Sequence, residues 1–187
     1  CMPRRPAKCY RYQTRPPYTR KEYIRGAPDP KIRIYDMGAK NKVFPIYLTL
    51  CSLEKGQVSH NALEAARMSV NRFLTKMLTR ERYHLRIRAH PHHVIRENRM
   101  MAFAGADRLQ DGMRKAFGKP SGRAARVDLG NPLVTVGVYE DSVKTALEAL
   151  RRAAMKFPVK SRVFVEKAPE EIVKRLGLSW ISEVRKT

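Results

Sequence analysis

The sequence predicts an α+β fold in which two main helices pack on a mixed sheet. Several segments alternate apolar and polar side chains, which is typical of half-buried strands. Two longer segments repeat apolar residues at steps of three and four, which is typical of helices with one buried face. Each helical segment follows a pair of strand-like segments, so both helices are expected to cover one sheet of about six strands.

The strands are predicted from period-two patterns and from the turns between them. Residues 31–35 alternate charged and apolar side chains. A β-rich segment farther along the chain places Ile46, Leu48 and Leu50 on one face. The last pair of strands before the second helix is expected to form a hairpin around Gly130. The expected strands are residues 31–35, 43–53, 83–88, 127–129, 133–139 and 161–166, and residues 94–95 form a short apolar segment.

Three helices are predicted. The first begins at Ser59 or His60, and the second begins near Asp141, with acidic residues early and basic residues late, as the helix dipole favours. A short third helix, residues 169–176, is expected to end at Gly177. The residues expected on buried faces are Leu63, Ala66, Val70, Phe73 or Leu74, and Met77 in the first helix, and Val143, Ala146, Leu147 and Leu150 in the second.

The chain is expected to form one domain with two appendages. Residues 1–29 are predicted to form an extended basic arm that binds RNA, and residues 30–166 a single α+β domain. Residues 98–122 are expected to form a long basic loop inserted in this domain, because their glycines and arginines give no reliable helical face. Residues 167–187 are predicted to form a C-terminal tail that contains the short helix.

Positive charge is concentrated near the N-terminal end of the chain. Lysine and arginine outnumber aspartate and glutamate 39 to 17, which gives a formal net charge of +22. Between residues 2 and 26, bases alternate with tyrosines, and prolines keep the segment from forming a helix. Arginine side chains match phosphate oxygens, and tyrosine rings stack on unpaired bases. Structured RNA is therefore the expected partner.

Other kinds of site are less well supported. The run His90-Pro91-His92-His93 has no cysteine or acid pair at metal-ligand spacing, so solvent exposure or RNA contact is favoured over a metal site. Neither a phosphate-binding glycine loop nor a nucleophile elbow is found, so no enzymatic activity and no cofactor are expected. DNA or an anionic surface remains an alternative on charge alone, although no zinc finger or helix-turn-helix is evident.

Composition also indicates the compartment. Three scattered cysteines form no disulfide framework, which favours a reducing environment. No stretch approaches the roughly 18 apolar residues that a membrane-spanning helix needs. The sequence therefore predicts a soluble intracellular protein.

Several motifs, taken in chain order, resemble a known family. They are RRPAKCYRY at 4–12, KIRIYDMG at 31–38, ALEAAR at 62–67, HPHHVIREN at 90–98, AGADRLQDGMRKAFGKP at 104–120, ALRRA at 149–153 and KFP at 156–158. They closely resemble the large-subunit ribosomal proteins called L-sixteen in bacteria and L-ten-e in archaea and eukaryotes. The long arm is similar to that of the archaeal branch.

The resemblance implies a fold of the α/β-hammerhead type and a place in the large ribosomal subunit of the cytoplasm. It implies that the chain binds large-subunit ribosomal RNA, lies near the 5S RNA and approaches transfer RNA in the aminoacyl site, beside neighbouring ribosomal proteins. The loop at 98–122 would point towards the peptidyl-transferase region and support accommodation of transfer RNA. The rival interpretation is an RNA-processing or RNA-modifying enzyme with a basic docking arm.

Residue pattern and resemblance together predict which side chains contact RNA. In the arm these are Arg4, Arg5, Lys8, Tyr10, Arg11, Tyr12, Arg15, Tyr18, Arg20, Lys21 and Arg25. In the domain and its loop they are His92, His93, Arg96, Arg99, Arg108, Arg114, Lys115, Lys119 and Arg123.

Overall fold

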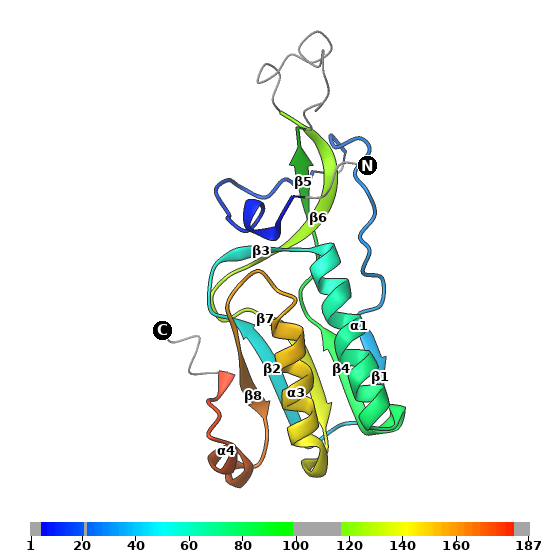
Figure 1. Ribbon diagram of the computed structural model, residues 1–187, viewed down its shortest axis with the longest axis vertical. Coiled ribbons are helices and arrows are strands. Elements are labelled where there is room, and N and C mark those ends of the chain that lie inside the picture. Colours follow the sequence, from blue (N-terminus) through cyan, green and yellow to red (C-terminus); the bar gives the residue numbers. More distant parts are fainter. Residues whose placement is uncertain (1–4, 21, 99–116, 182–187) are drawn as a thin grey trace.

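The computed structural model describes residues 5–20, 22–98 and 117–181 of the chain (Figure 1). Its described strands form two antiparallel sheets, one of five strands in the order β1-β4-β7-β2-β8 and one of three in the order β3-β6-β5. The α+β class with two main helices is confirmed. The strands are divided between two sheets, however, where the sequence predicted a single mixed sheet.

The five-stranded sheet consists of β1 (Asp36–Gly38), β2 (Ile46–Ser52), β4 (Tyr83–Ile87), β7 (Pro132–Val138) and β8 (Ser161–Lys167). The expected face of β2 is confirmed, since Ile46, Leu48 and Leu50 are fully buried. The strand expected at 31–35 is wrong, because the ladder with β4 begins only at Asp36. Ile32 is 1% exposed and Ile34 is 53% exposed, so this stretch does not present its two isoleucines to one side.

The three-stranded sheet consists of β3 (Gly56–Ser59), β5 (His93–Glu97) and β6 (Lys119–Val127). The hairpin predicted around Gly130 is wrong, because β6 pairs with β3 and β5 whereas β7 pairs with β2 and β4. The turn at Gly130, whose φ is 73°, carries the chain from one sheet to the other. The predicted loop also extends too far at its C-terminal side, because its last residues, from Lys119, belong to β6.

The two main helices are α1 (His60–Met77) and α3 (Val143–Ala154), and the short helix is α4 (Glu170–Leu176). Ser59 caps α1 by accepting a hydrogen bond from the backbone N–H of Ala62, so the predicted start is confirmed. The end of α4 at Gly177 is also confirmed. Met77, expected on the buried face, is 56% exposed instead. Short 3-10 helices lie at η1 (Ala7–Cys9), η2 (Arg80–Arg82) and η3 (Glu140–Ser142).

The core lies between the five-stranded sheet and the two long helices. Both helices lie on the same side of that sheet, whereas β5 and the start of β6 project beyond them at the opposite end from α4 (Figure 1). Leu63 and Leu150, one from each helix, are fully buried against residues of the sheet. No helix in the described part of the chain is both long and apolar enough to cross a membrane. The three-stranded sheet therefore forms a projection, and the N-terminal arm lies along it.

Candidate nucleic-acid interface

The arm is joined to both edges of the three-stranded sheet. The backbone N–H of Gln57 in β3 donates to the carbonyl oxygen of Arg11 at 2.8 Å, and that of Val94 in β5 donates to Tyr18 at 3.0 Å. Because β6 occupies the centre of this sheet, the outer edges of β3 and β5 carry backbone groups that need partners. The described arm residues supply partners for some of these groups. Residues 5–20 of the arm therefore lie docked on the domain.

Side chains reinforce this docking. The amide nitrogen of Gln13 donates to the carbonyl oxygens of Gly56 at 2.5 Å and Val127 at 2.9 Å. The guanidinium of Arg126 donates to the carbonyl of Pro16 at 3.1 Å, and burial lowers the pKa of this arginine. These contacts tie the arm to β3 and β6 in addition to the edge hydrogen bonds.

Two carboxylates anchor arm cations that were expected to bind RNA. Arg11 forms an ion pair with Glu54, and the nitrogen Nε of Arg5 lies 3.6 Å from Glu97. The hydroxyl of Tyr10 also donates to Glu97, at 2.6 Å. Burial of this hydroxyl is the main cause, and the hydrogen bond to Glu97 the second, of a rise in the pKa of Tyr10 to about 12. In the described structure these three side chains therefore hold the arm against the domain.

Arg96 in β5 joins the arm to the start of β6. Its guanidinium carbon lies 4.7 Å from the ring centroid of Tyr18 and 3.5 Å from that of Phe117. Its Nη1 also donates to the carbonyl oxygen of Phe117 at 3.1 Å. The two rings meet edge to face with centroids 6.2 Å apart. One planar cation thus connects three segments that are distant in sequence.

His93 has a neutral, positioning role in this arrangement. Its Nδ1 accepts a hydrogen bond from the backbone N–H of Tyr18 at 2.8 Å. Burial, together with the electrostatic effect of Arg126, His92 and Arg96 nearby, lowers the pKa of His93 to about 4. The ring is therefore uncharged near pH 7 and contributes shape and a hydrogen-bond acceptor. His92 is exposed, and its Nδ1 lies 3.1 Å from the carbonyl oxygen of His90.

The remaining predicted RNA contacts divide into two groups. Exposed among the described residues are Lys8, Tyr12, Arg15, Arg20, Arg25 and Lys119, whereas Arg123 is half-buried. Outside the described residues lie Arg4, Lys21, Arg99, Arg108, Arg114 and Lys115, together with most of the predicted loop.

Some residues of the interface were not singled out from the sequence. Gln13 and Arg126 clamp the arm and belong to none of the motifs recognised in the sequence, whereas Phe117, which packs on Arg96, lies within the motif at 104–120. Their partners are far away along the chain, so only the folded structure brings them together. Within residues 5–20, 22–98 and 117–181, no three His, Cys, Asp or Glu side chains form a group that could hold a metal ion.

Comparison with known proteins identifies relatives across nearly the whole chain. The family model described as Ribosomal protein L16p/L10e matches residues 13–164. The large ribosomal subunit protein uL16 of Staphylothermus marinus is 54% identical over 162 residues, which cover 87% of this chain and 93% of that protein. The uL16 of Hyperthermus butylicus is 49% identical over 175 residues, covering 91% of this chain and 97% of that protein.

A eukaryotic relative is similar over the same region. The large ribosomal subunit protein uL16A of Schizosaccharomyces pombe is 50% identical over 169 residues, covering 89% of this chain and 76% of that protein. These matches confirm the resemblance drawn from the motifs and disfavour the rival enzyme. The chain belongs to the ribosomal protein L16p/L10e family, a structural and non-enzymatic family of the large ribosomal subunit.

Proposed function

We propose that this chain, a structural constituent of the cytoplasmic large ribosomal subunit, binds large-subunit ribosomal RNA through one continuous surface. We call this surface the arm interface and define it as residues 5–20 together with β3, β5 and β6. The observation that carries the proposal is that several cations of this surface are exposed and unpaired within the described structure. The side chains of Lys8, Arg15, Arg20 and Lys119 are exposed and form no hydrogen bond or ion pair with another described residue.

Phosphate groups are the partners that suit such cations. Exposed guanidinium and ammonium groups that have no carboxylate beside them bind the RNA backbone by releasing its counterions. Tyr12 is 69% exposed and offers a flat ring on which an unpaired base can stack. The neighbouring Arg11 lies 6.0 Å from the centroid of that ring. The arm interface therefore combines backbone neutralisation with stacking.

The docking of the arm favours this function energetically. A disordered arm would lose conformational freedom when it bound RNA, and that loss would weaken the complex. The contacts of Gln13, Tyr18 and Arg126 hold the arm in place before RNA arrives. Glu54 and Glu97 neutralise only the cations nearest the sheet, which leaves the outer ones for phosphates.

We further propose that the chain lies near the 5S RNA and that its 98–122 segment supports accommodation of transfer RNA in the aminoacyl site. This part rests on the family resemblance of the loop motif. It is supported by where the segment leaves and rejoins the fold, since β5 ends at Glu97 and β6 begins at Lys119. Both ends lie at the tip of the projection in Figure 1, next to the contact between Arg96 and Phe117.

A two-part experiment tests the RNA interface. Hydroxyl-radical cleavage of RNA in purified large subunits should show a protected backbone region that is lost when the protein is absent. Neutralising two arm cations, in Arg15→Gln with Arg20→Gln, should weaken this protection. The matched control neutralises two exposed cations of α4, in Lys174→Gln with Arg175→Gln, which lie at the opposite end of the molecule (Figure 1). Equal effects of the two pairs would contradict the proposed surface.

A further inference from the structure

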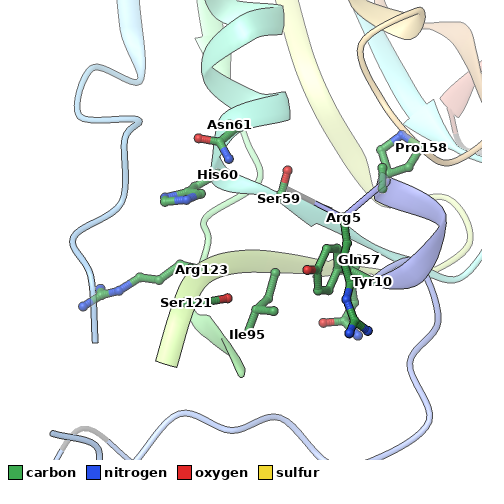
Figure 2. Close-up of a pocket in the computed structure, with 12 residues that line it drawn as sticks. Arg5, Tyr10, Gln57, Ser59, His60, Asn61, Ile95, Ser121, Arg123 and Pro158 are labelled. Carbon is green, nitrogen blue, oxygen red and sulfur yellow. The ribbon is translucent and has the colours of Figure 1, made fainter. Parts of the chain in front are cut away.

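A cavity of about 160 Å³ lies where the arm meets the folded domain. Its lining comes from the start of the arm, from β3 and the first turn of α1, from β5 and β6, and from Pro158 after α3. Figure 2 shows Tyr10 of the arm on one side, Ile95 and Ser121 below, and Asn61 above. The cavity exists in this form only because the arm is docked.

The walls of the cavity offer flat and apolar surface. The ring of Tyr10 is held in place because its hydroxyl donates to Glu97 at 2.6 Å. Ile95 and Pro158 add aliphatic surface. An aromatic ring between such walls would gain stacking and burial of its apolar faces. A planar ligand is therefore favoured over an extended aliphatic one.

A β-bulge shapes the floor of the cavity. Ile95 of β5 pairs with Gly122, whereas the next residue, Arg96, pairs with Pro120. Ser121 is therefore an extra residue in β6 without a partner in the register. Bulges of this kind redirect a side chain and are frequent next to functional sites. Here the bulge places Ser121 in the lining of the cavity.

Polar atoms of the lining have unused hydrogen-bonding capacity. Oε1 of Gln57, Oδ1 of Asn61 and Nε of Arg123 are buried and make no hydrogen bond with another described residue. The first two are acceptors and the third is a donor. Buried polar groups are normally satisfied, so such a cluster in one cavity is unusual. A ligand that satisfies the two amide oxygens must carry N–H donors, whereas the Arg123 side chain extends away from the centre of the cavity.

We propose that this cavity binds one unpaired pyrimidine base of large-subunit ribosomal RNA, turned out of its strand. The inference rests on the proposed RNA-binding function and specifies a subsite of the arm interface. Cytosine and uracil carry N–H donors on one flat six-membered ring, whereas the purines have two fused rings. An apolar cavity of about 150 Å³ is known to accommodate benzene, so a single ring fits the volume.

The surroundings suit the rest of the nucleotide. Arg5 and Arg123 both line the cavity, and Figure 2 shows their side chains extending away from its centre in different directions. A sugar and phosphate left outside would meet the guanidinium group of Arg123, which suits phosphate oxygens, whereas Arg5 already lies 3.6 Å from Glu97. A base held between Tyr10 and the domain would also keep the arm docked. Binding of the base and docking of the arm should therefore be coupled.

The test uses large ribosomal subunits and probes the RNA bases and the RNA backbone with separate reagents. Dimethyl sulfate and a carbodiimide report the Watson–Crick edges of all four bases, and hydroxyl radicals report the backbone. In wild-type subunits, one unpaired pyrimidine within the protein's backbone footprint should be protected. Asn61→Leu removes an acceptor and fills space, so it should raise the reactivity of that base about tenfold, the effect of about 1.4 kcal/mol. The exposed, remote Asn41→Leu is the matched control and should leave the protection unchanged.

A second variant keeps the test decisive. Ser121→Phe fills the floor of the cavity from another strand, and it should expose the same base while the backbone footprint persists. The proposal is overturned if no pyrimidine in the wild-type footprint is protected, or if protection survives both variants. A backbone footprint without a protected base would leave the RNA interface standing and remove only this inference. Absence of any footprint in wild-type subunits would instead contradict the proposed function itself.

Discussion

The backbone N–H of Tyr18 donates a hydrogen bond to Nδ1 of His93 at 2.8 Å, and this contact requires the imidazole nitrogen to be unprotonated. Val94, which follows His93 in β5, donates its backbone N–H to the carbonyl oxygen of Tyr18 at 3.0 Å. The arm is thus fixed to β5 at two adjacent points. One of them depends on a titratable ring, so the docking of the arm should respond to acid.

Docking of the arm should weaken as the pH falls. The pKa of His93 is lowered from 6.5 to about 4 by burial and by Arg126, His92 and Arg96, so the undocked state binds more protons between these values. The stability of the docked arm therefore rises as the pH increases from about 4 to 6.5, and this contribution is lost below about pH 4. The contact at stake is one partly exposed hydrogen bond of about 1 kcal/mol. Amide exchange of Tyr18 should accelerate from pH 6.5 towards 4, relative to core amides, and His93→Gln should abolish that dependence.

Replacing Arg96 should loosen the arm even when the charge is kept. Arg96→Lys retains the cation but loses the plane that contacts Tyr18 and Phe117, so arm docking should weaken by about 1 kcal/mol. Cleavage by trypsin after Arg20 in the isolated protein measures this change. The matched control is Arg152→Lys, which removes a similar contact with Phe73 at 3.8 Å in the helical layer. If both variants expose the arm equally, the role assigned to Arg96 is wrong.

The sequence was informative wherever structure is determined locally. The face of β2 and the capped start of α1 follow from side-chain period and from Ser59 as a capping residue. The strand β6 was missed in part because its centre contains small residues such as Gly122 and Ala124, which give no apolar alternation. The division into two sheets could not be predicted, because the choice of partner for β6 and β7 depends on segments far away in the chain.

At the candidate site, too, the sequence predicted residue types but not contacts between distant segments. The residue types of the arm predicted a basic surface, but not that Arg11 would pair with Glu54 and hold the arm in place. The hydrogen bonds to the edges of β3 and β5 come from backbone groups, which every residue carries and which leave no sequence signal. His93 could not be distinguished from His92, since only its burial next to cations lowers its pKa.

Gly38 should tolerate no side chain. Its φ is 83°, and a Cβ there would overlap the carbonyl oxygen of Tyr83. Gly38→Ala should therefore lower the free energy of unfolding by about 3 kcal/mol, from overlap plus backbone strain. Gly26→Ala is the matched control, because its φ is 71° but nothing lies within 4 Å, and it should cost only about 1 kcal/mol. Urea unfolding of the two isolated variants makes the comparison, and equal losses would refute the steric argument.

Binding to ribosomal RNA should depend steeply on salt. If arm and loop neutralise about eight phosphates, log K should fall with log salt at a slope of roughly −6 to −7. The double variant Arg15→Gln with Arg20→Gln should reduce the slope by about 1.4 to 1.8, because two phosphate contacts are lost. The α4 pair Lys174→Gln with Arg175→Gln should leave it unchanged. A wild-type slope near −2 would mean that most of these cations remain in solvent.

Arg108→Ala with Arg114→Ala should impair translation more than assembly. Both residues belong to the loop motif that resembles the family and lie outside the described residues. The docked arm and the three-stranded sheet remain to hold the protein on ribosomal RNA, so the yield of large subunits should stay near that of wild type. The expected defect is slower accommodation of transfer RNA or slower peptide-bond formation, measured per assembled ribosome. If the segment only braces ribosomal RNA, subunit yield should fall instead while each assembled ribosome translates at the normal rate, and that outcome would refute a role in transfer-RNA accommodation.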